Sequence, residues 1–467
     1  MTRQETLFGL LLWFAILSAN LFTATRSPTV WHDEVYFADP AIHFAEGDGF
    51  RTTAWTLVPE DKFWPGLAPA YGFLLGTWLK LAGVELWQVR ALPILLAAVA
   101  ALWVWWTARR HRHVASAAMG WFLLAALLCG SGVSFSYRSG RGDALAMLWW
   151  AATYAGLASP AGHLRSWSLF LLGAVAPWCG AYLAPTIALA GIFLILLFGR
   201  QWLGPVLSVW AGFAAGLLCM IGLYWHLGSW DTYVTCVRYY QNGILSPQFE
   251  LRLNGFRDPG LIVVALGLAL CVVGITDPKR RIAIYALGAV LCIGLLQALS
   301  AKWPVYYTWL AFFPALLALA HVMPAITSPL RKFVMPALAC VIVTGLPARL
   351  GVSMLEWGQR DHQVIEEFAT GKFRADDWVV CDPSAYFALR PLVHVLYPRA
   401  VDMTHEINAD TKRSITAVCV RSEVSPEKIS SIFGGKWTRI ASLGDRSPAM
   451  KFGEAAAYRL VAYRRMN

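Results

Sequence analysis

The chain has 467 residues, of which 57% are hydrophobic and only 14% are charged. Soluble domains usually carry about 25% charged residues, so this composition indicates an integral membrane protein and argues against an ordinary soluble enzyme. The net charge of +11 is spread over short loops between apolar segments. Because it forms no single basic face, nucleic acid is not expected as a partner.

Apolar segments recur along the first three quarters of the chain. A helix that crosses a bilayer needs about 20 apolar residues, and about eleven segments approach that length. The first has no small-residue cleavage site and is predicted to be a retained anchor. The expected spans lie near residues 7–24, 91–108, 114–136, 144–158, 167–182, 185–199, 205–225, 260–276, 282–300, 304–322 and 333–350.

Basic residues predict the orientation, since cytoplasmic loops of membrane proteins carry an excess of lysine and arginine. We expect residues 66–82 to lie along the membrane surface instead of crossing it. The loops at Arg109–Arg112, Arg200 and Lys279–Arg281 then share the side of the N-terminus, which we take as the cytoplasm. The loops that carry most of the candidate catalytic and binding residues lie on the opposite, extracytoplasmic face of the cytoplasmic (inner) membrane.

From residue 351 the composition changes to that of a soluble domain. Strand-like runs alternate there with helical patterns, which predicts a small α/β domain. The runs lie near residues 378–381, 393–397, 415–420, 437–442 and 458–463. The predicted fold class is therefore mainly α. A polytopic helical bundle, with surface helices in its first outer loop, fills residues 1–350, and an extracytoplasmic α/β domain fills residues 351–467.

The nine cysteines show neither a CxxC pair nor a histidine–cysteine ligand spacing, so no zinc site is predicted. Cys381 and Cys419 share the soluble region, where they are expected either as a disulfide or as two buried thiols. The sequence requires no cofactor and leaves the use of a divalent metal open.

Asp33 and Glu34 follow the first span and place two adjacent carboxylates at the membrane surface. Ionisable groups in that position are costly unless they are solvated or used, so the pair is a candidate site. Asp33 is the expected catalytic base, which takes a proton from an acceptor hydroxyl. Glu34 could bind a sugar hydroxyl, hold a cation or raise the pKa of Asp33. A solvated turn at the helix exit is the alternative explanation.

Arg138, Arg141 and Asp143 form a second candidate set, in the outer turn after the third span. Arginines three residues apart can share one face of a helix, and their guanidinium groups suit bidentate contacts with phosphate. The ordinary alternatives are a capping role for Asp143 and arginines that reach to the membrane interface.

Lys302, Tyr306 and Tyr307 form a third set at the outer end of a late span. A lysine there can meet a lipid phosphate as a point charge, although headgroup anchoring also explains it. Arg238 in the long loop 226–259 is a further candidate, for which an amphipathic surface helix is the simpler explanation.

The order of these sets along the chain resembles the GT-C glycosyltransferases. An Asp-Glu pair follows the first span, an arginine-rich turn ending in Asp143 follows the third, and Lys302-x-x-x-Tyr306-Tyr307 opens a late span. The resemblance covers roughly residues 5–325. It points in particular to the branch that contains the protein O-mannosyltransferases and the lipid A aminoarabinose and galacturonic acid transferases.

The resemblance implies a role for each candidate residue. Asp33 is the implied base, with Glu34 beside it. Lys62 is the counterpart of a Lys-Pro-Pro-like element of the family, although the chain reads Asp61-Lys62-Phe63-Trp64-Pro65 there. The implied ligands of the donor phosphate are Lys302, Arg138, Arg141 and Lys62. The implied substrate-binding residues are Asp143, Tyr306, Tyr307, Tyr36 and Arg238.

The function implied by the resemblance is an inverting glycosyltransferase. It would move a sugar from a polyprenyl-phosphate donor to an extracytoplasmic acceptor such as lipid A, a glycan, another lipid or a protein, with membrane lipids around it. One alternative is an oligosaccharyltransferase or glycan ligase that uses a lipid-diphosphate donor. Another is a non-enzymatic transporter of lipid-linked sugars, which is less favoured because the chain shows no inverted repeat.

Overall fold

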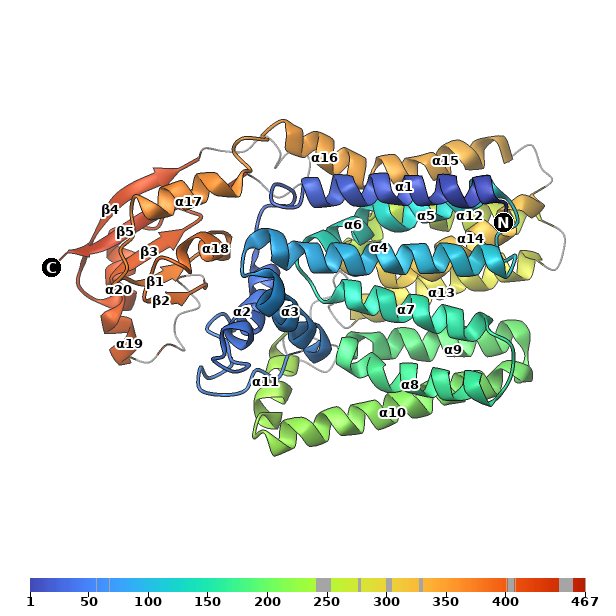
Figure 1. The fold of residues 1–467 in the computed structure, drawn as a ribbon, viewed down its shortest axis with the longest axis horizontal. Helices are drawn as coiled ribbons and strands as arrows, with labels where there is room; N and C mark the ends of the chain where they lie inside the picture. The colour runs from blue at the N-terminus through green and yellow to red at the C-terminus, as the bar shows by residue number, and fades with distance from the viewer. Residues whose placement is uncertain are drawn as a thin grey trace.

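The computed structural model describes residues 1–55, 57–66, 68–240, 253–275, 279–299, 305–326, 331–399, 401, 407, 409–444 and 457–466. A bundle of long helices makes up most of the molecule, and a small sheet covers one end of it (Figure 1). The bundle helices are α1 (Arg3–Phe22), α4 (Leu86–Arg110), α5 (Ala117–Cys129), α6 (Ser131–Arg138), α7 (Asp143–Ala158), α8 (His163–Cys179), α9 (Ala184–Phe198), α10 (Leu203–His226), α12 (Pro259–Gly274), α13 (Lys279–Leu299), α14 (Trp309–Val322), α15 (Arg331–Val343) and α16 (Leu346–Met354).

Four helices among the described residues are long and apolar enough to cross a membrane: α1, α4, α10 with its preceding turn, and α13. The pair α5 and α6, bent by 51° at Gly130, makes a fifth if it counts as one span. Shorter apolar helices include α9 and α12. Every expected span contains a helix, and the chain is an integral membrane protein. The expected number of about eleven spans is not confirmed, since several of these helices are short.

Two helices, α2 (His32–Glu46) and α3 (Pro69–Ala82), lie between the bundle and the sheet (Figure 1). With 14 residues, α3 is too short to cross a bilayer, in agreement with the surface helix expected at residues 66–82. Gly76 lets α3 approach α2 closely, because a Cβ atom there would lie 2.8 Å from the carbonyl oxygen of Ala41. Helix α11 (Trp230–Tyr240) lies near the same end of the bundle (Figure 1).

The sheet has five strands in the order β2-β1-β3-β5-β4. β1 is parallel to β2 and β3, whereas β5 is antiparallel to β3 and β4. The small C-terminal sheet predicted from the sequence is therefore confirmed. Its strands are β1 (Trp378–Cys381), β2 (Val395–Tyr397), β3 (Ala417–Val420), β4 (Lys436–Leu443) and β5 (Leu460–Met466). The helices around it are α17 (His362–Thr370), α18 (Tyr386–Leu389), α19 (Ala409–Ser414) and α20 (Pro426–Phe433).

Short 3₁₀ turns complete the chain. They are η1 (Ala181–Leu183), η2 (Arg200–Trp202), η3 (Asn254–Arg257), η4 (Val305–Tyr307), η5 (Met323–Ala325) and η6 (Pro383–Ala385). Cys381 and Cys419 face each other across the β1–β3 pair, and both are buried free thiols. Helix α16 runs through residue 350, where the domain boundary was expected; that boundary stays a prediction.

The C-terminal residues share a hydrophobic core with the helices of the first outer loop. Val35 of α2, Leu75 of α3 and Cys381 of β1 belong to one buried cluster. Polar contacts reinforce the junction. The Tyr386 hydroxyl donates to Oδ1 of Asp39 over 2.7 Å, and the backbone N–H of Val30 donates to the Tyr458 hydroxyl over 3.2 Å. Through this packing the sheet helps to fix the start of α2, where the Asp-Glu pair lies.

Candidate active site

Asp33 and Glu34 lie in the first turn of α2. Carboxylates are favourable there because the first N–H groups of a helix are unpaired and carry partial positive charge. Successive helical residues point about 100° apart, so the two side chains enter different surroundings. The Asp33 side chain is 18% exposed, whereas that of Glu34 is completely buried.

Glu34 is held by Arg90 of α4 in a bidentate pair. Nε and Nη2 of Arg90 each donate to one carboxylate oxygen of Glu34 over 2.6 Å. Nη1 of the same arginine donates to the carbonyl oxygens of Ala24 and Pro28, also over 2.6 Å. Buried charges are tolerated when they are paired and hydrogen-bonded. This ion pair therefore joins α4, the end of the first span and α2.

Arg138 at the end of α6 has a comparable setting. Its guanidinium is buried, and Nη1 donates to Oδ1 of Asn20 over 2.6 Å. Nη2 donates to the hydroxyl of Thr23 over 2.8 Å and to the carbonyl of Ser27 over 2.6 Å. These contacts tie α6 to the chain just beyond α1. A phosphate could reach Arg138 only by displacing them, so the geometry gives this arginine a structural role.

The turn between α6 and α7 carries Arg141 toward Asp33. Gly140 in this turn has φ +65°, and a Cβ atom there would lie 2.7 Å from Cγ of Glu34. Glycine is therefore required for both backbone conformation and space. The Tyr71 hydroxyl donates to the Gly140 carbonyl over 3.0 Å. Glu34 thus helps to shape the turn that presents Arg141.

Arg141 bridges two carboxylates. Its Nη1 donates to Oδ2 of Asp33, and its Nε donates to Oδ2 of Asp143 over 2.7 Å. The Ser136 hydroxyl donates to the same oxygen of Asp143 over 2.8 Å. The Tyr306 ring lies 4.1 Å from the guanidinium carbon, which adds a cation–π contact. Arg141, Asp33 and Asp143, from two distant segments, therefore form one cluster.

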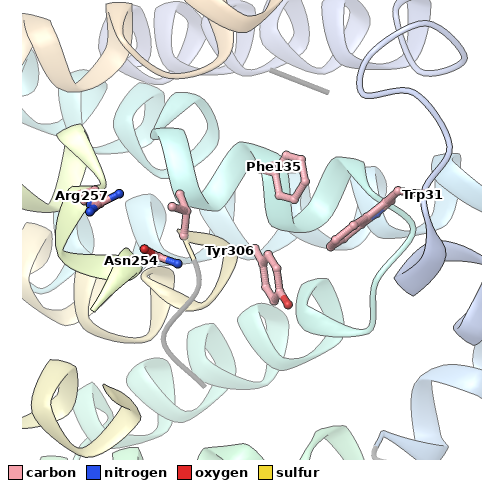
Figure 2. Close-up of a pocket in the computed structure, with 6 residues that line it drawn as sticks. Trp31, Phe135, Asn254, Arg257 and Tyr306 are labelled. Carbon is pink, nitrogen blue, oxygen red and sulfur yellow. The ribbon is translucent and has the colours of Figure 1, made fainter. Parts of the chain in front are cut away.

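A pocket of about 450 Å³ opens beside this cluster. Figure 2 shows the rings of Trp31, Phe135 and Tyr306 toward one side of it, and Asn254 and Arg257 toward the other. Trp31 packs edge-on against Phe135 and Tyr306, with ring centroids 5.3 and 5.5 Å apart. The pocket combines aromatic walls with an exposed cation, a lining that suits an amphiphile with an anionic group.

The positions of Arg257 and Tyr306 are fixed by Asp258. This residue caps α12 and accepts a 3.0 Å hydrogen bond from the backbone N–H of Gly260. The Thr308 hydroxyl donates to its second oxygen. Asp258 thereby joins η3, which ends at Arg257, to η4, which contains Tyr306.

Tyr307 lies behind Tyr306, close to Arg141. Its ring centroid is 5.1 Å from the guanidinium carbon of Arg141 and 5.1 Å from the ring of Tyr182. The two tyrosines therefore surround Arg141 with ring faces.

Similarity to solved structures was found over nearly the whole chain, whereas no protein-family model and no curated protein sequence matches it. ArnT from Cupriavidus metallidurans bound to undecaprenyl phosphate superposes with a TM-score of 0.64 at 13% identity, covering 97% of each chain. The apo state of the same protein gives 0.58 at 14% identity, again over 97% of each chain. Arabinofuranosyltransferase AftD from Mycobacteria gives 0.46 at 16% identity, over 100% of this chain and 40% of its own.

The chain has a GT-C fold. The resemblance predicted from the sequence is confirmed at the level of architecture. Within the GT-C fold, the cluster is formed by three segments that are distant in sequence: the start of α2, the α6–α7 turn and η4. The members predicted from the sequence that come together are Asp33, Arg141, Asp143, Tyr306 and Tyr307.

Other predicted residues lie elsewhere in the GT-C fold. Tyr36 is one turn further along α2, beside His32, and burial raises its pKa to about 12. Lys62 is exposed in the loop before α3, and Arg238 is exposed on α11. Lys302 lies outside the described residues, so its role as a phosphate ligand stays a prediction.

Arg257, Asn254 and Phe135 were not singled out from the sequence, although they line the pocket. The signal for Arg257 is its position in Arg257-Asp258-Pro259, directly before an apolar helix with a proline at its first turn. An arginine at that point lies at a helix N-terminus by necessity. Its proximity to the Asp33 turn is decided only by the packing of η3 against η4.

One group among the described residues has the spacing of metal ligands: His43, Glu46 and Asp48. Their ligand atoms lie within 4.8 Å of one another. Two arginines already engage the carboxylates, because Arg390 pairs with Glu46 and Arg51 pairs with Asp48. The group is thus explained as an ion-pair network between the first outer loop and the C-terminal residues.

Proposed function

We propose that the chain is an inverting glycosyltransferase that moves a sugar from a polyprenyl-phosphate donor to an extracytoplasmic acceptor. The observation that carries this proposal is the Asp33–Arg141 cluster beside an aromatic pocket with an exposed arginine. The GT-C fold adds support, since ArnT, which has the same architecture, was solved with undecaprenyl phosphate bound. The C-terminal residues and this cluster lie together on the extracytoplasmic side of the inner membrane.

The donor phosphate binds where cations and aromatic rings meet. Arg257 faces the pocket as an exposed cation, and Arg141 lies behind Tyr306. Guanidinium groups form strong, charge-assisted hydrogen bonds with phosphate oxygens. The rings of Trp31 and Phe135 cover the apolar part of the donor next to its headgroup. Lys302 supplies a further positive charge, as expected from its place before η4.

Donor binding prepares Asp33 for its role as base. Arg141 donates a hydrogen bond to Oδ2 of Asp33, and this bond competes with a proton for the carboxylate. The two anionic oxygens of the donor phosphodiester offer Arg141 a bidentate partner and draw its Nη groups toward the donor, while Asp143 keeps hold of Nε. Asp33 is then released to accept the proton of the acceptor hydroxyl.

The transfer step needs one base and no strong acid. The acceptor oxygen attacks the anomeric carbon and loses its proton to Asp33, while the bond between that carbon and the phosphate oxygen breaks. The phosphate departs with the electron pair and is stable as an anion. Glycoside hydrolases differ, because their alkoxide-like leaving groups require a second carboxyl group as acid. Attack opposite the leaving phosphate inverts the anomeric centre.

A gene deletion followed by mass spectrometry of lipids and surface glycans tests the function in the cell. We expect the loss of one sugar of defined mass, restored by the wild-type gene and not by a gene encoding D33N. Purified protein is then offered matched lipid-monophosphate and lipid-diphosphate sugars. Transfer from the monophosphate supports the proposal. Transfer only from the diphosphate indicates a glycan ligase, and movement of lipid-linked sugar across vesicles without transfer indicates a transporter.

A further inference from the structure

His32, the first residue of α2, lies directly against the proposed base. Its Nε2 atom is 3.0 Å from Oδ1 of Asp33, the oxygen that does not face Arg141. The imidazole ring packs against the rings of Trp31 and Tyr36, with centroid distances of 4.9 and 5.8 Å. Its side chain nevertheless stays 56% exposed. His32 is therefore held in place by aromatic neighbours and open to water at the same time.

The C-terminal sheet carries a second carboxylate, Asp382, whose charge acts on this histidine. Asp382 follows β1, and its backbone N–H donates to the Cys419 carbonyl of β3 over 2.7 Å. Its Oδ1 accepts a 2.9 Å hydrogen bond from the backbone N–H of Ser384. The chain leaves β1 toward β2 and later returns on the other side as β3. Asp382 thus occupies the carboxyl end of a topological switch point, where open α/β sheets place their ligands.

Three charged groups act on His32, and each comes from a different element. They are Asp33 in α2, Arg141 in the α6–α7 turn and Asp382 before η6. Partial desolvation by the groups packed around His32 is the largest influence and lowers its pKa, although the side chain keeps contact with water, and the charge of Arg141 lowers it further. The hydrogen bond and charge of Asp33, helped by the charge of Asp382, outweigh both and raise the pKa of His32 above its ordinary value.

We propose that His32 is a positioning residue that acts through Asp33, receiving the acceptor proton from Asp33 and releasing it to water. The proposal rests on the proposed transferase function.

One proton passes from the acceptor hydroxyl to water in each turnover. The acceptor hydroxyl gives its proton to Oδ1 of Asp33, because Oδ2 is the atom that faces Arg141. The resulting carboxyl group passes this proton to Nε2 of a neutral His32, which becomes an imidazolium. That transfer is downhill, since a carboxyl group has a pKa of about 4 and an imidazole one of about 6.5. The imidazolium loses its Nδ1 proton to water, which leaves Asp33 as a carboxylate and the ring with its proton on Nε2. Proton exchange with water then returns the ring to the Nδ1–H tautomer, whose Nε2 can accept the next proton.

The pH dependence of transfer tests the proposal. His32 must be neutral to receive a proton, so the rate should rise with pH as His32 loses its charge. In D382N a negative charge is removed and the pKa of His32 falls, so this rise should move to lower pH by about 0.5 unit. D410N is the matched control, because Asp410 belongs to the same C-terminal region and is 95% exposed. Its profile should equal that of the wild type.

The H32Q variant distinguishes a proton relay through His32 from a role in which His32 only holds Asp33 in place. Glutamine can still donate a hydrogen bond to Asp33 but cannot take up a proton. We expect the rise with pH to disappear and the rate to fall by about 10- to 100-fold, at the low end of general acid–base effects. A variant that keeps the wild-type rate and pH profile would overturn the relay, and so would a D382N profile that does not move.

A measurement that needs no catalysis keeps the outcomes distinct. NMR titration of ¹³C-labelled histidine in wild type and D382N, with H32Q to assign the signal, gives the pKa of His32 directly. A lower pKa in D382N with a shifted rate profile supports the proposal. A lower pKa with an unchanged profile overturns the relay and leaves the transferase function standing. If wild-type protein titrates as expected but transfers no donor sugar, the proposed function fails and the relay fails with it.

Discussion

Asp33 and Glu34 are neighbours in sequence and opposites in environment. Glu34 is buried, and Arg90 occupies both of its oxygens. Asp33 is part-exposed, shares Arg141 with Asp143 and faces an exposed histidine. Arg138 and Arg141 are both buried and differ in their partners, because oxygens of residues 20–27 enclose Arg138 whereas Arg141 packs against Tyr306 at the wall of the pocket.

The difference teaches how a membrane protein uses the same residue types for two purposes. A buried charge whose hydrogen-bonding capacity is met by protein atoms fixes the fold. A charge that is only partly satisfied, and that water or a ligand can reach, is available for chemistry. The closed pair Glu34–Arg90 shapes the Gly140 turn, and that turn presents Arg141 to Asp33. The buried Glu34–Arg90 pair thus supports the part-exposed Asp33 and its contact with Arg141.

D33N is the strongest test of the difference between Asp33 and Glu34, because it removes the proposed base and keeps the shape of the side chain. We expect transfer to fall by about 10²- to 10⁴-fold, the usual contribution of a general base. The melting temperature should change little, since Asp143 still pairs with Arg141. Transfer assays on detergent-purified protein, together with thermal unfolding, measure both quantities. A D33N variant with the wild-type rate would exclude Asp33 as the base.

E34Q should give the reverse pattern, with stability affected first. The substitution leaves Arg90 buried without its ionic partner, which typically costs about 3–5 kcal/mol. E423Q is the control, because the exposed Glu423–Arg439 pair should contribute no more than about 1 kcal/mol. Thermal unfolding of both variants measures the effect. Equal melting temperatures for E34Q and E423Q would contradict a structural role for Glu34.

His362 extends the comparison to pH, since it is buried against the rings of Phe387 and Tyr458 and neither ring nitrogen has a hydrogen-bond partner. Burial, helped by the charge of Arg90, lowers its pKa from 6.5 to about 4. Between pH 4 and pH 6.5 the imidazole of His362 is therefore protonated in the unfolded chain and neutral in the folded protein. Stability is fully present above pH 6.5 and is lost as the pH falls toward 4, by up to about 3 kcal/mol.

H362L tests this dependence. Relative to the wild type, the variant should lose less of its melting temperature between pH 7.5 and pH 4.5, because leucine takes up no proton. The two proteins should differ little at pH 7.5. Parallel thermal unfolding curves at both pH values measure the effect, and an identical acid response of the two proteins would show that His362 is already protonated or solvated when folded.

R257A should have the smallest of these effects, and it should change only the binding of the donor at the pocket. Loss of a charge-assisted hydrogen bond to phosphate costs about 1.5–3 kcal/mol, which corresponds to roughly a 10- to 100-fold higher KM for the donor. Stability should be unchanged, since Arg257 is exposed. R439A, another exposed arginine, is the control. A fall in kcat with an unchanged KM would place Arg257 outside the donor-phosphate site.

Local pattern predicted the elements well. The strand-like runs near 378–381 and 415–420 became β1 and β3, and one of the helical patterns between the runs became α20 with a Ser425 cap. These predictions rest on periodicity and capping, which are properties of adjacent residues. The number of spans was harder to predict, because short apolar helices such as α9 and α12 cannot be told from full spans by composition alone.

The order of the motifs along the chain predicted the candidate site residues. It did not predict which of them are held by protein atoms and which lie at the pocket. Asp33, Arg141 and Asp143 do meet, as the resemblance implied. Nothing in the residue types distinguished Arg138 from Arg141, because only the bend after α5 and the end of α1 decide that Arg138 contacts Asn20 whereas Arg141 contacts Asp33. Arg257, one of the charged residues of the outer loop 226–259, was not chosen as a site residue for the same reason, since its neighbour Tyr306 is about 50 residues away in sequence.

The sequence by itself determined that the chain is a membrane protein with a small α/β region, because hydropathy and periodicity are local and additive. It also determined which charged residues stand beside the apolar segments. Tertiary structure alone decided which of them are closed by partners and which stay open, because burial depends on neighbours from distant segments. For Asp33 and Glu34 those neighbours are Arg141 and Arg90, which lie 108 and 56 residues away.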